Sequence, residues 1–340
     1  MKIARSLTFA FVIFCQVVAH AECPPASPWN EADKLFRGDP HWVGADSAFS
    51  VYLGGDRSLW LFGDTFIDHT GSHSREHLQV MIRNSVAIQE GRNPETATMK
   101  FFWNGNRGLE SSAFFPHPGD GWYWPAHGVL LDGRLLLFMN SMRSTDEHLG
   151  FESAGWDAYI VDNPGDEAQD WSLRPAALPA RDARIQLGFA GVLLHDEHIY
   201  AFGSPDENKR HPIHVARWPY DSAYEGDLTG IEWWGGAAAG WVAGAASDSK
   251  AVLFMGGHTE ATFHYDDDAD LFVAVYTIGF GDADVVTRTA ESITGPWSEP
   301  RTVFRPPEFG KPRIMIYAGK AHPQLAGSDL VLTYATNTFE

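Results

Sequence analysis

The sequence predicts an all-β fold, a five-bladed β-propeller that occupies residues 22–340. Helical periodicity is weak throughout, whereas 33 Gly, 20 Pro and 13% aromatic residues suit many short strands joined by turns. In addition, one hairpin pattern occurs five times: two short apolar strands flank a turn containing Gly or Asp, and the second strand carries an aromatic residue. Repeated sheets arranged about an axis form a propeller.

The five hairpins are spaced regularly enough for one blade each. The aromatic residues of their second strands lie 58 to 76 residues apart, which leaves room for a four-stranded sheet with long loops, and these residues are Phe62, Phe138, Phe202, Tyr276 and Tyr334. The fifth hairpin is expected to pair 322–325 with 330–334. Because few residues follow it, we expect Trp29–Val43 to supply a strand that closes the ring. A β-sandwich with coincidentally similar hairpins is the alternative.

The first 21 residues have the organisation of a secretory signal peptide. Lys2 and Arg5 precede an apolar run from Leu7 to Ala19, which is too short to span a membrane comfortably. Ala19-His20-Ala21 then fits the cleavage pattern of small residues. We therefore expect a secreted or periplasmic protein without a membrane partner, and an N-terminal anchor is the alternative. Cleavage leaves Cys23 as the one cysteine, so stability has to come from packing.

The charge and the motif content exclude several classes of function. Asp and Glu number 44 against 25 Lys and Arg, a net charge of −19 that becomes −21 after cleavage. Nucleic acid is not an expected partner, because its binding requires a basic footprint. The acidic run Asp266–Asp270 lacks the Gly and the distant Glu of a calcium loop. No metal site and no required cofactor are predicted, with a structural cation in the central channel left open.

Three carboxylates are the candidates for chemistry. Asp46 precedes the first strand of hairpin one and Asp64 ends the second, so a turn centred near Gly55 places them opposite each other. Facing Cβ atoms lie ~4.5–5.5 Å apart, and one of two such acids should have a raised pKa. Glu260 holds the equivalent position before the fourth hairpin. Inner strands of a propeller bring such positions to one mouth, although each Asp alone also suits a turn or a cap.

Four further residues are predicted to contact substrate. His127 and His322 belong to the second and fifth hairpins, where imidazole bonds either a sugar hydroxyl or a neighbouring channel group. Trp124 and Trp241 lie near the beginnings of blades. An indole ring there either stacks on the apolar face of a sugar or packs between blades.

Several stretches that together span nearly all of the predicted domain follow a known pattern. They are Gly44–Asp46, Leu59–Thr65, Thr287–Ser298, Ala318–Pro323 and Leu332–Asn337. These stretches resemble the secreted five-bladed propeller glycoside hydrolases, which include arabinanases, arabinofuranosidases and xylosidases. The nearest similarity is to a bacterial family that includes endo-D-arabinanases. The resemblance implies a funnel-shaped site with an Asp base, a second Asp that tunes pKa, and a Glu acid; matched by motif, these are Asp46, Asp64 and Glu260.

The predicted function is cleavage of a furanose-containing, arabinan-like polysaccharide by a secreted monomer. In this hypothesis Asp46 deprotonates water, Glu260 protonates the departing oxygen, and Asp64 keeps Asp46 ionised or raises the pKa of the acid. A non-catalytic carbohydrate-binding propeller is the first alternative, since it would not need all three carboxylates. A phosphorylase or transferase is the second, and a phosphorylase would require basic residues at the mouth.

Overall fold

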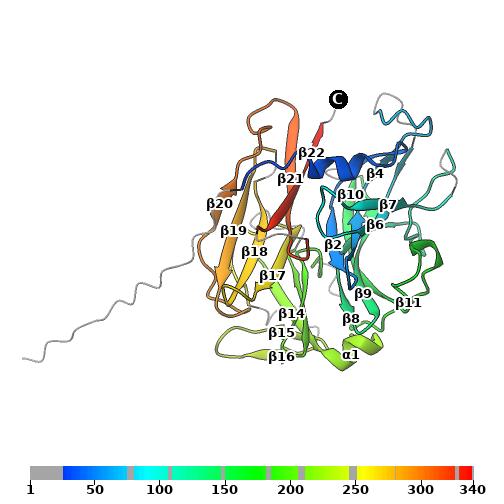
Figure 1. Ribbon diagram of the computed structural model, residues 1–340. Coiled ribbons are helices and arrows are strands. Elements are labelled where there is room, and N and C mark those ends of the chain that lie inside the picture. The colour runs from blue at the N-terminus through cyan, green and yellow to red at the C-terminus, as the bar shows by residue number, and fades with distance from the viewer. Residues whose placement is uncertain are drawn as a thin grey trace, which may run out of the picture.

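Strands form most of the regular structure in the computed structural model (Figure 1), which describes residues 26–74, 80–105, 109–146, 150–180, 185–205, 211–244, 251–279, 281–325 and 329–338. Its helical segments in these ranges are short: η1 (Ala32–Arg37), η3 (Ala168–Asp170) and α1 (Tyr220–Glu225). The all-β prediction is therefore confirmed. No helix of the described residues is long and apolar enough to cross a membrane. The predicted signal peptide, residues 1–21, lies outside the described residues.

Four antiparallel sheets of the described residues each begin with a predicted hairpin. The first two sheets contain β2 (Phe49–Tyr52), β3 (Arg57–Phe62), β6 (Ser85–Glu90) and β7 (Thr98–Phe102), and then β8 (Trp122–Leu131), β9 (Arg134–Ser144), β10 (Phe151–Val161) and β11 (Leu173–Pro175). The next two contain β12 (Val192–His195), β13 (His198–Gly203), β14 (His214–Pro219), β15 (Glu232–Trp234) and β16 (Trp241–Ala243), and then β17 (Ala261–Asp266), β18 (Leu271–Ile278), β19 (Asp284–Ala290) and β20 (Arg301–Phe304).

The last hairpin, β21 (Ile314–His322) and β22 (Val331–Thr338), forms a two-stranded sheet within the described residues. The first strands of the five hairpins contact one another in a cycle: β2 contacts β8, β8 contacts β12, β12 contacts β17, β17 contacts β21, and β21 contacts β2. These five first strands therefore surround one central region of the molecule.

Two details of the predicted topology are wrong. The first strand of the last hairpin ends at His322 instead of beginning there, and Pro323, which has no N–H to donate, lies in the turn that follows. In addition, Trp29–Val43 does not close the ring with β22. It contains η1 and the start of β1 (Trp42–Ala45), and β1 pairs with β4 (Thr65–Ile67) because it continues the register of the first hairpin. β4 also pairs with β5 (Val80–Ile82).

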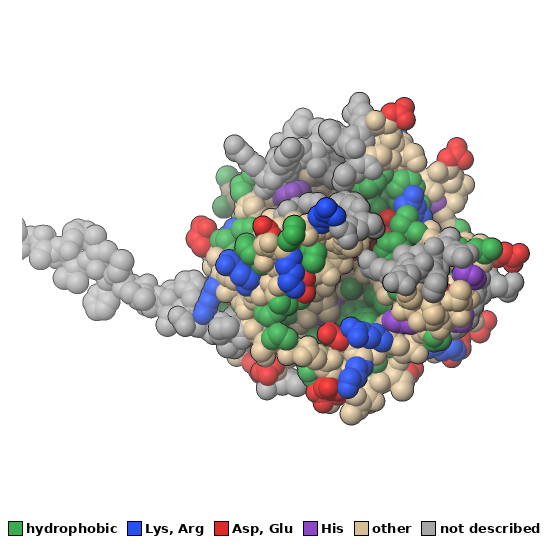
Figure 2. Space-filling model, turned by 90° about the horizontal axis from the view of Figure 1, so that it is seen from above, with side chains coloured by type: hydrophobic (Ala, Val, Ile, Leu, Met, Phe, Trp, Pro, Cys, Tyr) green, Lys and Arg blue, Asp and Glu red, His purple; other side chains and the backbone are tan. Residues whose placement is uncertain are grey.

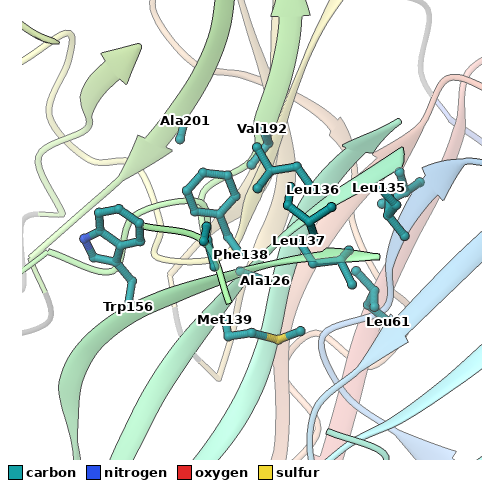
Figure 3. Close-up of a cluster of buried hydrophobic side chains, with 14 of the residues drawn as sticks. Leu61, Ala126, Leu135, Leu136, Leu137, Phe138, Met139, Trp156, Val192 and Ala201 are labelled. Atoms are coloured by element: carbon teal, nitrogen blue, oxygen red, sulfur yellow. The ribbon is translucent and has the colours of Figure 1, made fainter. Parts of the chain in front are cut away.

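The core lies between neighbouring sheets. Figure 3 shows the part around β9, where side chains from several sheets meet and are almost fully buried, among them Leu61, Leu135, Leu136, Leu137, Phe138, Trp156, Val192 and Ala201. Between the third and fourth sheets, the rings of Phe202 and Phe263 stack 3.8 Å apart. Burying one such side chain stabilises the fold by ~1.5–3 kcal/mol. Packing of this kind fixes the ends of the inner strands, where the candidate site lies.

Candidate active site

The first hairpin brings Asp46 and Asp64 face to face. The pairing of β2 with β3 and that of β1 with β4 share one register, and the two Asp residues lie between these pairings. The N–H of Asp46 donates to the carbonyl of Asp64 at 3.3 Å, and the N–H of Gly63 donates to the carbonyl of Asp46 at 3.2 Å. The facing register derived from the turn at Gly55 therefore holds. Figure 2 views the molecule from this end, where the face is hollowed near its centre and carries charged side chains on its rim.

Gly63 has no side chain, and the Asp46 carboxylate occupies the space that a Cβ at position 63 would fill. A Cβ built on Gly63 would lie 2.4 Å from Oδ1 of Asp46 and 3.0 Å from Oγ of Ser47. The chain also turns sharply after Asp46, since Ser47 and Ala48 have φ of 65° and 55°. Residues other than glycine seldom adopt such φ values, and those that do are often found at functional sites. Both features hold the Asp46 side chain against the opposite strand.

We expect Gly63→Ala to displace the Asp46 carboxylate while leaving the fold intact, because Gly63 itself does not have a left-handed φ. A misplaced catalytic group can cost ~10²-fold in rate. The measurement is kcat/KM together with the melting temperature. Gly230→Ala, at a position without a left-handed φ where a Cβ meets no neighbour within 4 Å, is the control for a general effect of alanine at a glycine position. A fully active Gly63→Ala enzyme would contradict the placement.

The pKa of Asp46 is raised to about 8. Burial is the largest cause, and the negative charges of Glu260 and Asp64 come next. The hydroxyl of Tyr317 opposes this shift by donating to Oδ2 of Asp46 at 3.2 Å. The carboxyl group of Asp46 therefore favours its protonated form at neutral pH. The predicted effect of Asp64 on the pKa of Asp46 is present, but burial and Glu260 contribute more.

Asp64 lies in a more polar environment. Burial raises its pKa, but Trp124 and Arg83 counteract that effect. Nε1 of Trp124 donates to Oδ1 of Asp64 at 3.0 Å, and Nη1 of Arg83 lies 3.3 Å from the same oxygen. The guanidinium of Arg83 in turn lies 4.2 Å from the centre of the Trp122 ring. Trp124 thus lies beside Asp64, with its indole N–H directed to that carboxylate, and its contact with substrate stays a prediction.

Glu260 makes a buried ion pair. Its Oε1 accepts from Nζ of Lys320 at 3.0 Å, and the side chains are 10% and 0% exposed respectively. The same ammonium group donates to the carbonyl of Ala318 at 3.3 Å and lies 4.3 Å from the centre of the Phe49 ring. Burial lowers the pKa of Lys320, and the charge of Glu260 opposes this. Charged side chains are rarely buried without a partner, so the ion pair explains how both Glu260 and Lys320 can be buried.

The two histidines predicted to contact substrate, His127 and His322, form hydrogen bonds within the protein instead. Nδ1 of His127 accepts from the N–H of Val192 at 2.9 Å, and its Nε2 donates to the carbonyl of Ser50 at 3.0 Å, while burial lowers its pKa to about 4. His322 is fully buried, and its ring nitrogens bond the hydroxyls of Ser50 and Thr333. Neither ring has a nitrogen left for a sugar in this geometry, which supports the alternative of neutral channel groups.

Trp241 does not lie near the inner strands, where its predicted contact with substrate requires it to be. It lies on β16, which is the edge strand of its sheet, four strands from the inner strand β12. Its ring packs on Trp234 and lies 4.3 Å from the guanidinium carbon of Arg217. The repeat pattern places only the hairpins, and the two short strands β15 and β16 after the third hairpin carry Trp241 to the periphery.

Four residues of the site escaped the sequence analysis: Gly63, Arg83, Tyr317 and Lys320. Lys320 had a signal, because a lysine among the small and apolar residues of the strand 314–322 indicates a buried charge with a partner. Among the described residues, no group of three or more His, Cys, Asp or Glu side chains is arranged to hold a metal ion.

Comparison with solved structures defines the class of fold. A Bacteroides ovatus protein that is provisionally described as a hydrolase matches with a TM-score of 0.67 and 17% identity, over 92% of this chain and 84% of that one. The α-L-arabinofuranosidase from Lactobacillus brevis matches with a TM-score of 0.50 and 14% identity, over 91% and 87%. The chain thus shares its fold with these hydrolases, and the resemblance to propeller glycoside hydrolases inferred from the sequence is confirmed at the level of the fold.

The chain belongs to the family described as Domain of unknown function (DUF5005), which matches residues 30–340. No curated protein gives a significant match to the chain.

Proposed function

We propose that the protein is a secreted, monomeric glycoside hydrolase with a five-bladed propeller fold. Its active site contains Asp46 and Glu260 as the acid/base pair and Asp64 as the residue that tunes them. The observation that carries this proposal is the convergence of three carboxylates, in which Asp46 faces Asp64 across the first hairpin and both Asp64 and Glu260 raise its pKa. Hydrolysis of a glycosidic bond requires one carboxyl group to protonate the leaving oxygen and another to activate water or attack the sugar.

The substrate we propose is a furanose-containing polysaccharide such as arabinan. The likeness to an α-L-arabinofuranosidase supports this class of sugar, and Trp122 and Trp124 beside Asp64 offer aromatic surface near the carboxylates. The cycle of contacts among the five inner strands supports the five-bladed arrangement. A purely binding role would give no reason to place two half-buried Asp carboxylates beside the buried Glu260, which costs free energy.

The test is the release of reducing ends from a panel of arabinans, arabinogalactans and xylans. We expect release from one of the arabinose-containing polymers, and loss of release in Glu260→Gln. Asp284→Asn is the control, since the carboxylate of Asp284, on the third strand of its sheet, pairs with Arg305 and not with any of the three acids. Binding of these polymers without release of any reducing end would contradict the hydrolase and favour a carbohydrate-binding propeller.

A further inference from the structure

A partly exposed guanidinium group lies beside the candidate carboxylates. Arg83 belongs to the two-residue link between β5 and β6, and its Nη1 lies 3.3 Å from Oδ1 and 3.4 Å from Oδ2 of Asp64. Its guanidinium carbon lies 4.2 Å from the centre of the Trp122 ring. The side chain of Arg83 is 38% exposed and that of Asp64 is 22% exposed. The cation is therefore held against an indole and an acid while part of it stays open to solvent.

The neighbouring residue Asn84 fixes the position of Arg83. Asn84 is fully buried, and its Nδ2 donates to the carbonyls of Phe115 at 3.1 Å and Tyr123 at 2.9 Å. Its Oδ1 accepts from the N–H of Phe115 at 2.7 Å. Since Tyr123 follows Trp122 on β8, these bonds tie the link that carries Arg83 to the strand that carries its indole support. A group held in advance loses little conformational freedom when it binds a ligand.

The protein uses only part of the Arg83 guanidinium, as a second arginine in the chain makes clear. Arg305 lies 4.3 Å from the centre of the Phe309 ring and directs both Nε and Nη2 to the two oxygens of Asp284, at 2.8 Å each. Arg83 contacts its acid through Nη1 alone. In the described part of the chain, neither Nε nor Nη2 of Arg83 makes a hydrogen bond. These N–H groups form a rigid fork that can bind two oxygen atoms of a ligand.

The charge around Arg83 favours a ligand without charge. The carboxylate of Asp64 already balances the guanidinium, and the whole chain carries a net charge of −19. A carboxylate or phosphate on the ligand would meet the negative charge of Asp64 at this position, and such a contact between like charges is unfavourable. Hydroxyl groups avoid that cost, since they accept from N–H groups and also donate to carboxylate oxygens. Two adjacent hydroxyls of a sugar match the fork.

We propose that Arg83 is a substrate-binding residue that holds two adjacent hydroxyl groups of a neutral sugar unit through Nε and Nη2. Because Arg83 contacts Asp64 directly, this sugar unit lies next to the three acids. The subsite rejects units that carry a carboxylate or a phosphate, so the polysaccharide that is cleaved is neutral at this position. The inference rests on the proposed hydrolase function and narrows its substrate class.

The test measures binding to the full chain by isothermal titration. The probes are neutral oligosaccharides prepared from arabinan, arabinogalactan and xylan, together with oligogalacturonate and inorganic phosphate. We expect the wild type to bind one of the neutral probes and neither of the anionic ones. Arg83→Met should bind that neutral probe ~10–10²-fold more weakly, the range for lost hydrogen bonds to a charged group. Arg305→Met is the matched control and should bind it like the wild type, since the fork of Arg305 is occupied by Asp284.

Arg83→Lys separates substrate binding from support of Asp64. Lysine restores a positive charge beside the carboxylate but lacks the planar fork. We therefore expect kcat on the cleaved polysaccharide to stay close to the wild-type value while KM stays raised by ~10-fold or more. Wild-type values of both constants in Arg83→Lys would reduce Arg83 to a support for Asp64 and would overturn the proposal.

The remaining outcomes separate this inference from the proposed function. Unchanged affinity and KM in folded Arg83→Met would overturn the inference, and so would binding of oligogalacturonate or phosphate that is lost in this variant. Cleavage of a polysaccharide with a KM independent of Arg83 would leave the hydrolase function standing without this subsite. Binding of a neutral probe that requires Arg83, without cleavage of any polymer, would support the subsite and remove the hydrolase function.

Discussion

Asp46→Asn is expected to lower kcat/KM on the natural polysaccharide by ~10²–10⁴-fold, the usual contribution of a general acid or base. An aryl arabinofuranoside should keep most of its rate in this variant, because an aryl oxide leaves without help from a proton donor. The reason is the environment of Asp46, whose half-buried carboxyl group has its pKa raised to about 8 and so carries a proton to donate. The measurement is kcat/KM on both substrates.

Glu260→Gln is the partner experiment. If Glu260 activates water, its loss should slow both substrates by similar factors, because the attacking water needs a base whatever group departs. Asp284→Asn should change neither rate. The opposite pattern, with Glu260→Gln slow only on the polysaccharide and Asp46→Asn slow on both, would assign the acid role to Glu260 and the base role to Asp46. Full activity of Asp46→Asn on both substrates would leave carbohydrate binding as the better hypothesis.

The parts of the structure that depend on local patterns could be predicted from the sequence. Alternating apolar residues and turn residues fix a hairpin within about fifteen positions, and the register of a hairpin follows from its turn. That is why the opposition of Asp46 and Asp64 was predictable from Gly55 alone. Glu260 was predictable because the inner strands repeat, and a position before one hairpin corresponds to the same position before another.

The parts that depend on contacts between sheets could not be predicted in this way. The ion pair of Glu260 and Lys320 joins residues 60 positions apart in different sheets. The bulge at Ala318 changes which residues of β21 face the carboxylates, and a strict alternation along the strand assigns Lys320 to the wrong side. His322 was assigned to the mouth because the strand was expected to begin there, whereas β21 ends at this residue and buries it.

Asp46→Asn should also change how stability depends on pH. A carboxyl group whose pKa rises on folding from 3.8 to about 8 costs the folded state nothing below the lower value, where it is protonated in both states. Its contribution is lost as pH rises towards 8, because only the unfolded chain then releases the proton freely. Since one pKa unit corresponds to ~1.4 kcal/mol, the wild type should lose on the order of a few kcal/mol between pH ~4 and ~8 through this group.

The asparagine variant has no proton to lose and should escape that penalty. The free energy of unfolding, measured by urea denaturation across this pH range, should therefore favour Asp46→Asn increasingly as pH rises. Asp284→Asn provides a control of opposite sign, because Arg305 lowers the pKa of Asp284 and its stabilisation is present above the ordinary pKa and lost as pH falls. If the difference between wild type and Asp46→Asn stayed constant with pH, Asp46 would be ionised as easily in the folded protein as in the unfolded chain, and it would have no proton to give at neutral pH.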